Sequence, residues 1–244
     1  DDIRNHFQRA YRPTGTIVGV AGRFDWESLQ DHVGSLLGDW QPAERAELAE
    51  SHHPAPYQHL SYDSNQTQIG VAYASVPYRS EDYFPAWGAV GILSGGMSAR
   101  LFTEVRERRG LCYSVYATHH TLPHLGGVFC YAGTSAERAQ ETLDVLLAEL
   151  QRLGEGVEEH ELERLKARIK SALIMQQESS SARSGSIARD WHHLGRARTL
   201  AELDALVDAL SSERINAYLA ANPPRQFTIV TLGRKELEVP LGVS

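Results

Sequence analysis

The chain has 244 residues, of which 42% are hydrophobic and 8% aromatic, and its formal net charge is −7. This composition is typical of a globular protein with room for one large or two small domains. An acidic chain without a long basic run argues against a nucleic-acid partner, and no apolar run approaches the roughly 18 residues that cross a membrane. The first residues, Asp1 to Arg4, do not form a signal peptide. The sequence leaves the compartment open, and we favour a soluble, cytoplasmic protein.

The first forty residues predict three elements, each defined by its apolar spacing and its capping residues. These are a helix over residues 1–10, a strand over 16–21 and a helix from Asp25 to about Leu37. Residues 41–56 are rich in Pro, Ala, Glu and His and have no apolar period, which is typical of a linker. We therefore expect a main domain at 57–244, which this linker joins to the segment 1–40.

The main domain is predicted to contain an antiparallel sheet covered by helices, an α/β fold of the layered type. A turn at residues 122–127 folds the strand that starts at Leu111 back into a hairpin, which makes the pairing antiparallel. Two Ser/Thr-x-x-Glu patterns, Thr134 to Glu137 and Thr199 to Glu202, are predicted capping boxes that open helices. The other predicted elements are strands near 57–62, 68–76 and 226–232, helices over 80–93, 158–177 and 212–221, and a helix that passes through Ile187 and Trp191.

Both cysteines lie on the predicted hairpin. Folding it about its turn places Cys130 opposite roughly residue 117, too far from Cys112 for a disulfide. We therefore predict two buried thiols, and the redox state of the compartment stays open.

The two ends of the chain carry a faint internal repeat. Near each end a helix and a proline turn lead to the sequence Thr-Ile-Val, at residues 16–18 and at 228–230. A repeat at domain spacing suggests tandem homologous halves, so residues 1–40 would be the remnant of an upstream homologous domain. A strand without its sheet leaves much apolar surface in contact with water. We therefore expect this segment to pair with another chain, in a possible homo-oligomer.

The stretch from Gly95 to Tyr113 joins a glycine break, a short helix and a strand. Gly95-Gly96 cannot propagate a helix cheaply, and Ser98 is the predicted N-cap of the helix that follows. Gly110 is the predicted stop of that helix. The helix wheel places an apolar stripe of Leu101, Phe102 and Val105 on one side. Arg106 and Arg109 lie at the edge of this stripe, and Glu104 and Glu107 face away from it. A guanidinium at the edge of a packed face, just before a strand with a tyrosine, can bind a ligand.

These residues resemble the C-terminal half of M16 zinc metallopeptidases, the pitrilysin and mitochondrial-processing-peptidase-like enzymes. The matching runs are 95–102, 104–107 and 109–115, and the resemblance covers nearly the whole chain, strongly from Gln68 to Leu150 and weakly elsewhere. In that family the N-terminal half carries the inverted zinc motif His-x-x-Glu-His. The C-terminal half lacks the metal and contributes an arginine and a tyrosine, seven residues apart, that hold the substrate backbone. Arg106 and Tyr113 match that spacing, and Arg109 is a rival on the helix wheel.

The resemblance implies a substrate-binding, non-catalytic half of a zinc metalloendopeptidase, with an M16 C-terminal-type domain at 57–244. None of the eleven histidines stands in the His-x-x-Glu-His pattern, so we expect no metal in this chain and a zinc ion in the missing N-terminal half. The expected partners are a peptide or unfolded polypeptide substrate and the catalytic half or a homologous subunit. This chain should then be inactive alone. The alternative is a non-enzymatic M16-like scaffold or assembly subunit that kept the fold and lost the chemistry.

Three further expectations keep an ordinary structural alternative beside the functional one. Arg106 and Tyr113 could be a surface arginine paired with a glutamate and a core tyrosine. Gly95, Gly96 and Ser98 lack the Gly-Lys-Ser/Thr of a phosphate loop, so we predict no nucleotide site there. A packing break is favoured for them, while the resemblance implies contact with the substrate. The acidic helix from residue 158 is predicted to be a solvated face with surface ion pairs such as Glu161–Arg164 and Glu163–Lys166.

Overall fold

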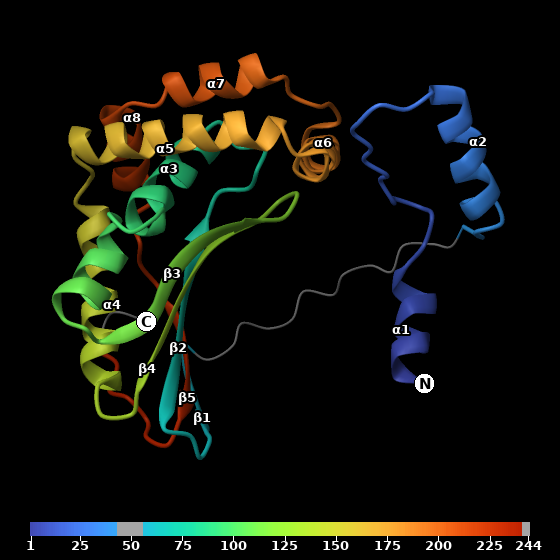
Figure 1. Ribbon diagram of the computed structural model, residues 1–244. Helices are drawn as coiled ribbons and strands as arrows, with labels where there is room; N and C mark the ends of the chain where they lie inside the picture. Colours follow the sequence, from blue (N-terminus) through green and yellow to red (C-terminus); the bar gives the residue numbers. More distant parts are fainter. Residues whose placement is uncertain (43–55, 241–244) are drawn as a thin grey trace. The chain divides into compact units, whose positions relative to one another are not determined.

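The computed structural model describes residues 1–42 and 56–240, and the chain divides into two compact units. The first unit comprises residues 1–52 and 174–198, and the second comprises 53–173 and 199–244. Figure 1 shows the second unit as a curved sheet with helices packed over it. The predicted boundaries at residues 40 and 57 stay a prediction, and residues 43–55 of the predicted linker lie outside the described residues.

The second unit is built on a five-stranded sheet with the order β1-β5-β2-β4-β3. Three neighbouring pairs are antiparallel, and β1 and β5 pair in parallel. The layered α/β fold is confirmed, whereas the parallel pair was not predicted because most of the domain separates its strands in sequence. The strands are β1 (Tyr57–Ser61), β2 (Gln66–Ser75), β3 (Cys112–Thr121), β4 (Gly126–Ser135) and β5 (Thr228–Gly233).

Helices cover the face of the sheet to which alternate strand residues point. In β2 the buried side chains follow a period of two, as expected for a strand with one covered face. Helix α3 is apolar on all sides and packs against both β3 and α8, while α4 packs on β2, β4 and α8. The helices of this unit are α3 (Tyr83–Ser94), η1 (Phe102–Arg108), α4 (Ala139–Gly154), most of α5 (Glu159–Gln177), α7 (Leu200–Asp208) and α8 (Ser212–Ala221). Their side chains form one core with the sheet, whose fully buried members include Ile69, Leu143, Leu150, Ile215 and Ile229.

The two predicted capping boxes have different outcomes. The box of Thr199 and Glu202 is confirmed, since both reciprocal hydrogen bonds are present at the start of α7. The other prediction is wrong, because Thr134 lies inside β4 and α4 begins only at Ala139. The Thr134 hydroxyl donates to the carbonyl oxygen of Leu111 at 2.6 Å. The Thr134 hydroxyl therefore bonds to the carbonyl oxygen of Leu111, next to the neighbouring strand, and does not cap a helix as the local pattern predicted.

The hairpin register agrees with the prediction for the cysteines. Cys130 lies opposite Ala117 in the β3–β4 pair, and Cys112 lies opposite Thr134. Both cysteines are free and buried. Burial raises the pKa of the Cys130 thiol to about 12, so this thiol stays protonated at neutral pH.

The first unit contains α1 (Asp2–Ala10), α2 (Trp26–Leu37), α6 (Ser180–Leu194) and the end of α5. The predicted cap is confirmed, since Asp25 accepts a hydrogen bond from the Ser28 amide at 2.9 Å. The predicted strand at 16–21 is wrong, because no strand is assigned there. That segment instead lies against α6, where a side chain at Gly19 would collide with the helix backbone at Ser184.

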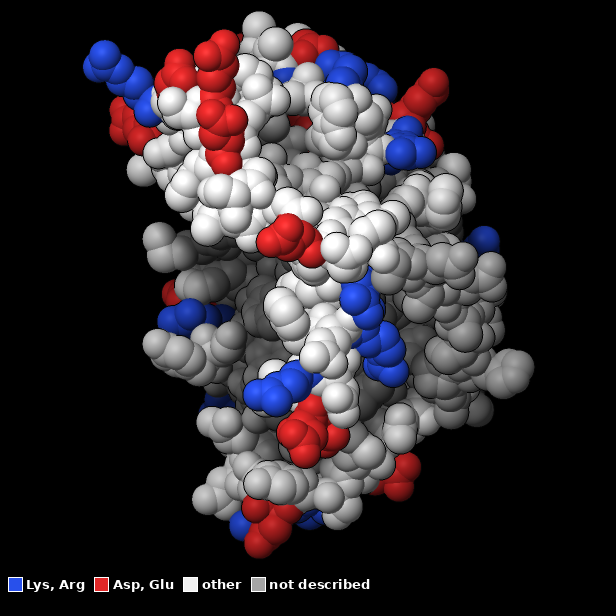
Figure 2. Space-filling model, turned by 90° about the vertical axis from the view of Figure 1, so that its right-hand side faces the viewer, with Lys and Arg blue, Asp and Glu red and all other residues white. Residues whose placement is uncertain are grey.

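The apolar side chains of α1 and α2 are left open to solvent. Neither helix has a buried residue, and Ile3, Trp26 and Leu36 are each more than half exposed. The face in Figure 2 is mostly uncharged, with acidic and basic side chains scattered over it. Among the described helices, none combines the length and the apolarity needed to cross a membrane.

Candidate functional site

The short helix after the glycine break is a π-helix. An ordinary helical turn starts at Arg100 and continues into η1, where hydrogen bonds join residues five apart and widen the turn. Such segments are rare and occur often at functional sites. Gly110 ends the helix as predicted, with a φ of +59°, a conformation that glycine adopts without strain.

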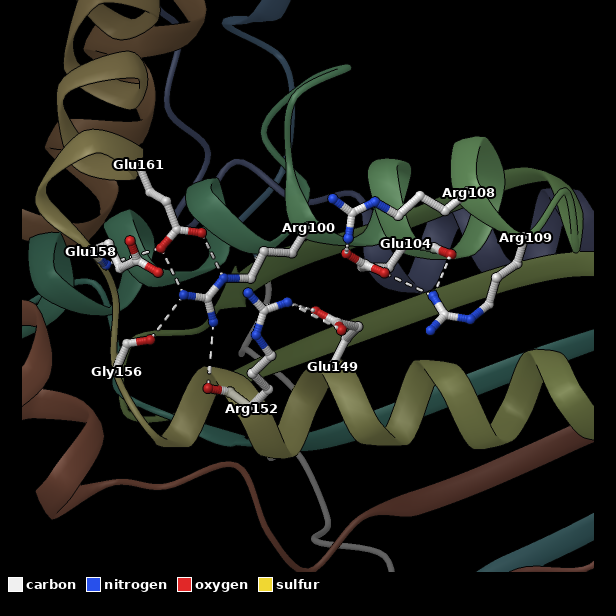
Figure 3. Close-up of polar contacts among 9 residues, drawn as sticks. All are labelled: Arg100, Glu104, Arg108, Arg109, Glu149, Arg152, Gly156, Glu158 and Glu161. Atoms are coloured by element: carbon white, nitrogen blue, oxygen red, sulfur yellow. Dashed lines mark hydrogen bonds and ion pairs between the residues drawn. The ribbon is translucent and has the colours of Figure 1, made fainter.

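The wider turn changes which side chains are buried. Leu101 and Val105 are fully buried, which confirms these two members of the predicted stripe, whereas Phe102 is only partly buried and contacts Arg106. The prediction for Glu104 is wrong, because its carboxylate is buried and pairs with both Arg108 and Arg109 (Figure 3). The wheel assumed a constant α-helical turn, and a π-helix rotates the later side chains to other positions.

Arg109 forms an ion pair with Glu104, which also pairs with Arg108. One of its guanidinium nitrogens, Nη1, donates to the Glu104 carboxylate at 2.8 Å and to the Glu104 carbonyl oxygen at 3.0 Å. Figure 3 shows Arg108 and Arg109 reaching the same carboxylate from two sides. The rival that the helix wheel left open therefore has partners within its own helix.

Arg106 is held differently, between two aromatic rings. The central carbon of its guanidinium lies 4.7 Å from the ring centre of Phe102 and 4.9 Å from that of Tyr113. Both distances are within the range of a cation–π contact. Within residues 1–42 and 56–240, its side chain makes no hydrogen bond or ion pair. The guanidinium thus keeps its N–H donors for a group outside the described chain.

A β-bulge sets the direction of Tyr113. Cys112 pairs with Thr134 and Ser114 pairs with Gly133, so Tyr113 is the extra residue in its strand. A bulge redirects a side chain that regular alternation would place elsewhere. Here Cys112 is buried while Tyr113 is 84% exposed, and its hydroxyl has no hydrogen-bond partner among the described residues. The bulge therefore presents the ring to Arg106 and leaves the hydroxyl open to a ligand.

A second, buried arginine anchors the start of this helix. Arg100 is 6% exposed and donates from Nε and Nη2 to the two carboxylate oxygens of Glu161, each at 2.7 Å. It also donates to the carbonyl oxygen of Gly156 at 2.9 Å (Figure 3). The predicted pairing of Glu161 with Arg164 is wrong, because the buried guanidinium offers a better, bidentate geometry.

The electrostatics of Glu161 follow from these contacts. Burial raises the pKa of the Glu161 carboxyl, but the hydrogen bonds from Arg100 and from the Glu158 amide outweigh it, so the pKa is lowered. Neither Arg100 nor Glu104 was predicted to be buried. Both lie within the runs that match the family, and a charged side chain beside an apolar stripe is buried only when it is paired.

The glycine turn has a clear packing reason. A side chain at Gly95 would collide with the carbonyl oxygen of Gly91, and Gly96 has a φ of +149°, which other residues rarely adopt. Ser98 is not the N-cap, because the helix begins two residues later, at Arg100. Contact of Gly95, Gly96 and Ser98 with a substrate stays a prediction.

The described residues do not fit a zinc ion, and His52 and His53 lie outside them. No group of three His, Cys, Asp or Glu side chains in the described ranges could hold a metal. His120 and His124 have a ligand-like spacing, but Pro123 separates them and His120 lies on a strand, where its ring contacts Phe129. A zinc site needs three or four converging donors, and this arrangement does not supply them.

Comparison with known proteins agrees with a layered α/β domain. The family model described as the peptidase M16 inactive domain matches residues 1–169. The chain therefore belongs to the peptidase M16 inactive-domain family, as its sequence motifs predicted.

The similar proteins are about twice as long as this chain. A Bacillus subtilis protein named "Uncharacterized zinc protease YmxG" is 28% identical over 224 residues, which cover 88% of this chain and 53% of the relative. "Uncharacterized zinc protease Mb2805c" of Mycobacterium bovis is 28% identical over 239 residues, covering 95% and 54%. The solved peptidase M16 inactive domain from Pseudomonas fluorescens has a TM-score of 0.73 at 22% identity, over 89% of this chain and 53% of that one. The chain thus spans about half the length of the curated relatives it matches.

Proposed function

We propose that this chain is the substrate-binding, non-catalytic half of a zinc metalloendopeptidase. The observation that carries the proposal is Arg106, which is fixed between two rings while its N–H donors have no described partner. The names of the relatives as zinc proteases support peptide-bond hydrolysis by the whole protein. The described residues contain no group of three metal ligands, which supports a zinc ion in a separate N-terminal half or homologous subunit.

Arg106 and Tyr113 would hold the substrate by its backbone. A guanidinium and a phenol both donate hydrogen bonds to peptide carbonyl oxygens, and neither reads the side chains of the peptide. Stacking on Phe102 limits the rotamers of Arg106, so less entropy is lost on binding. As a carbonyl oxygen gains negative charge during hydrolysis, the same donors would stabilise it.

The test compares Arg106→Ala and Tyr113→Phe with matched variants in the whole protein or in the complex with its catalytic half. Loss of one donor to a developing oxyanion typically lowers kcat by roughly 10²- to 10³-fold, and we expect losses in this range. The controls are Arg108→Ala, on the same helix, and Tyr116→Phe, another exposed tyrosine of the same strand. Peptide turnover is measured beside urea unfolding. If activity falls only in proportion to the folded fraction, the two residues are structural.

A non-enzymatic scaffold is the competing function, and metal analysis separates the two. Purified alone, this chain should hold no stoichiometric zinc and cleave no peptide, since its described residues supply no metal ligands. The whole protein should contain about one zinc ion and an upstream His-x-x-Glu-His motif. A whole protein without that motif and without zinc would identify a scaffold instead.

The exposed apolar surface of residues 1–40 fits a further partner. Ile3, Trp26 and Leu36 are too exposed to stabilise this unit by themselves, and segment 16–21 has no strand partner in the described chain. We expect these residues to pack against the homologous half or a second copy of the chain. Light scattering that shows a strict monomer, together with fast hydrogen exchange across residues 1–40, would contradict a second copy.

A further inference from the structure

We propose that a small pocket between the glycine turn and α5 binds a carboxylate group of the peptide. This inference rests on the proposed function, since it names a class of substrate for the same domain. The pocket has a volume of about 40 Å³. One wall is the end of α3 with the turn that follows, and the other wall is α5. The lining residues are Gly91, Ile92, Gly95, Ser98, Ala99, Glu161, Arg164, Leu165 and Arg168.

The charge of the pocket is positive and uncompensated. Arg164 and Arg168 are one helical turn apart and line the same pocket, and in the described part of the chain neither side chain has an ion pair or hydrogen bond. The one acidic lining residue, Glu161, is already held by Arg100 through two hydrogen bonds of 2.7 Å. Two like charges four residues apart destabilise a helix, so an anion between them would stabilise the pair.

Close packing at the glycines gives the pocket its shape. A Cβ atom at Gly95 would lie 2.5 Å from the Nη2 atom of Arg168, so only glycine lets this guanidinium lie against the turn. A Cβ atom at Gly91 would lie 2.7 Å from Leu165, so α3 and α5 approach closely at the floor of the pocket. The walls are therefore backbone and packed helices, and Arg164 and Arg168 are exposed side chains at the opening of the pocket.

The volume of the pocket and its two arginine side chains favour a carboxylate as the ligand. Guanidinium groups bind carboxylates with matched pairs of N–H donors. A single water needs ~10–15 Å³, so a pocket of about 40 Å³ has room for a carboxylate. In a peptide this group is an Asp or Glu side chain or the C-terminal carboxylate.

The experiment titrates three versions of one short peptide into the full 244-residue chain by calorimetry. The first has a Glu side chain and a C-terminal amide, the second has Gln and a free C-terminus, and the third has Gln and an amide. We expect one acidic version to bind about tenfold more tightly than the third. In Arg164→Gln/Arg168→Gln this preference should disappear, whereas Arg183→Gln/Arg189→Gln, with the same change in charge on the exposed surface of α6, should keep it. Comparing the first two peptides identifies which carboxylate is bound.

The outcomes separate this inference from the proposed function. Equal binding of all three peptides, or equal loss of the preference in both double variants, would overturn the pocket. Arg106→Ala is titrated with the neutral peptide alone. If that affinity is unchanged while the acidic preference still depends on Arg164 and Arg168, the pocket stands and the backbone-holding role of Arg106 fails. If no peptide binds at all, both proposals are overturned.

Discussion

Arg100 and Arg106 lie six residues apart in one helical segment, and their guanidinium groups have opposite surroundings. Arg100 is buried and donates to the Glu161 carboxylate and to the carbonyl oxygens of Gly156 and Arg152. Arg106 rests on two aromatic rings and donates to no described group. The contacts of Arg100 join the start of this helical segment to α5 and to the connection between α4 and α5. The guanidinium of Arg106 instead keeps its N–H donors available at the surface.

The difference shows that the role of each arginine depends on whether a carboxylate or another hydrogen-bond acceptor lies beside its guanidinium group. Carboxylates stand beside Arg100, Arg108 and Arg109, and each of these arginines is paired. Arg106 has aromatic neighbours instead, which hold a guanidinium without satisfying its N–H groups. Tyr113 reaches this position because of the bulge. The paired arginines should therefore affect stability, and Arg106 should affect binding and turnover.

The largest effect is expected at Arg100. Arg100→Ala leaves the Glu161 carboxylate buried without its partner, and breaking a buried pair costs about 3–5 kcal/mol. Urea unfolding measures the loss, with Arg164→Ala, an exposed neighbour, as the control. The double variant Arg100→Met/Glu161→Leu should recover most of the stability, because it removes both charges. A loss below about 1 kcal/mol in the single variant would show that the pair does not anchor the helix.

The glycine turn should give the next largest effect. Gly95→Ala places a methyl group against the carbonyl oxygen of Gly91, which is backbone and cannot rotate away. Overpacking of this kind costs about 1–3 kcal/mol. Gly185→Ala is the matched control, because a Cβ atom at that position in α6 meets nothing within 4 Å. That control should gain about 0.5–1 kcal/mol from better helix propensity. Equal effects of the two substitutions would contradict the close packing at the turn.

The Arg100–Glu161 pair also predicts a direction for the pH dependence of stability. The folded-state pKa of Glu161 is below its ordinary value of 4.5, so its contribution is present above that pH. The contribution is lost as the pH falls through the folded pKa, where the carboxylate takes up a proton. Unfolding free energies measured between pH 6 and pH 3 should therefore decrease, and Glu161→Gln should decrease less steeply. Parallel curves for the two proteins would assign the acid sensitivity to other groups.

The smallest effect is expected at Arg108. Its side chain is 67% exposed, and exposed ion pairs contribute about 0.2–1 kcal/mol. Arg109 still neutralises Glu104 when Arg108 is removed, so Arg108→Ala should change the free energy of unfolding by less than about 1 kcal/mol. Peptide turnover by the whole protein should stay within twofold of the unmodified protein. A turnover loss as large as that of Arg106→Ala would remove the distinction between paired and unpaired arginines.

Sequence patterns determined much of this domain. The apolar stripe of Leu101 and Val105, the stop at Gly110 and the position of Cys130 opposite Ala117 all depend on local periods. The cap at Asp25 and the capping box at Thr199 are likewise confirmed, because each bond joins residues only three apart. Family membership was also readable, since it depends on residue types at fixed spacing.

Only the tertiary structure decided which polar groups meet. Thr134 matched a capping pattern but donates to the carbonyl of Leu111, and Glu161 had a local partner but pairs with Arg100, 61 positions away. Glu104 was placed in solvent because the wheel could not anticipate a π-helix. In each case a buried polar group requires a partner; for Thr134 and Glu161 it comes from a distant part of the chain, and for Glu104 it comes from the same helix. Local spacing therefore determined the helices and strands, whereas burial determined the partners of the charged side chains.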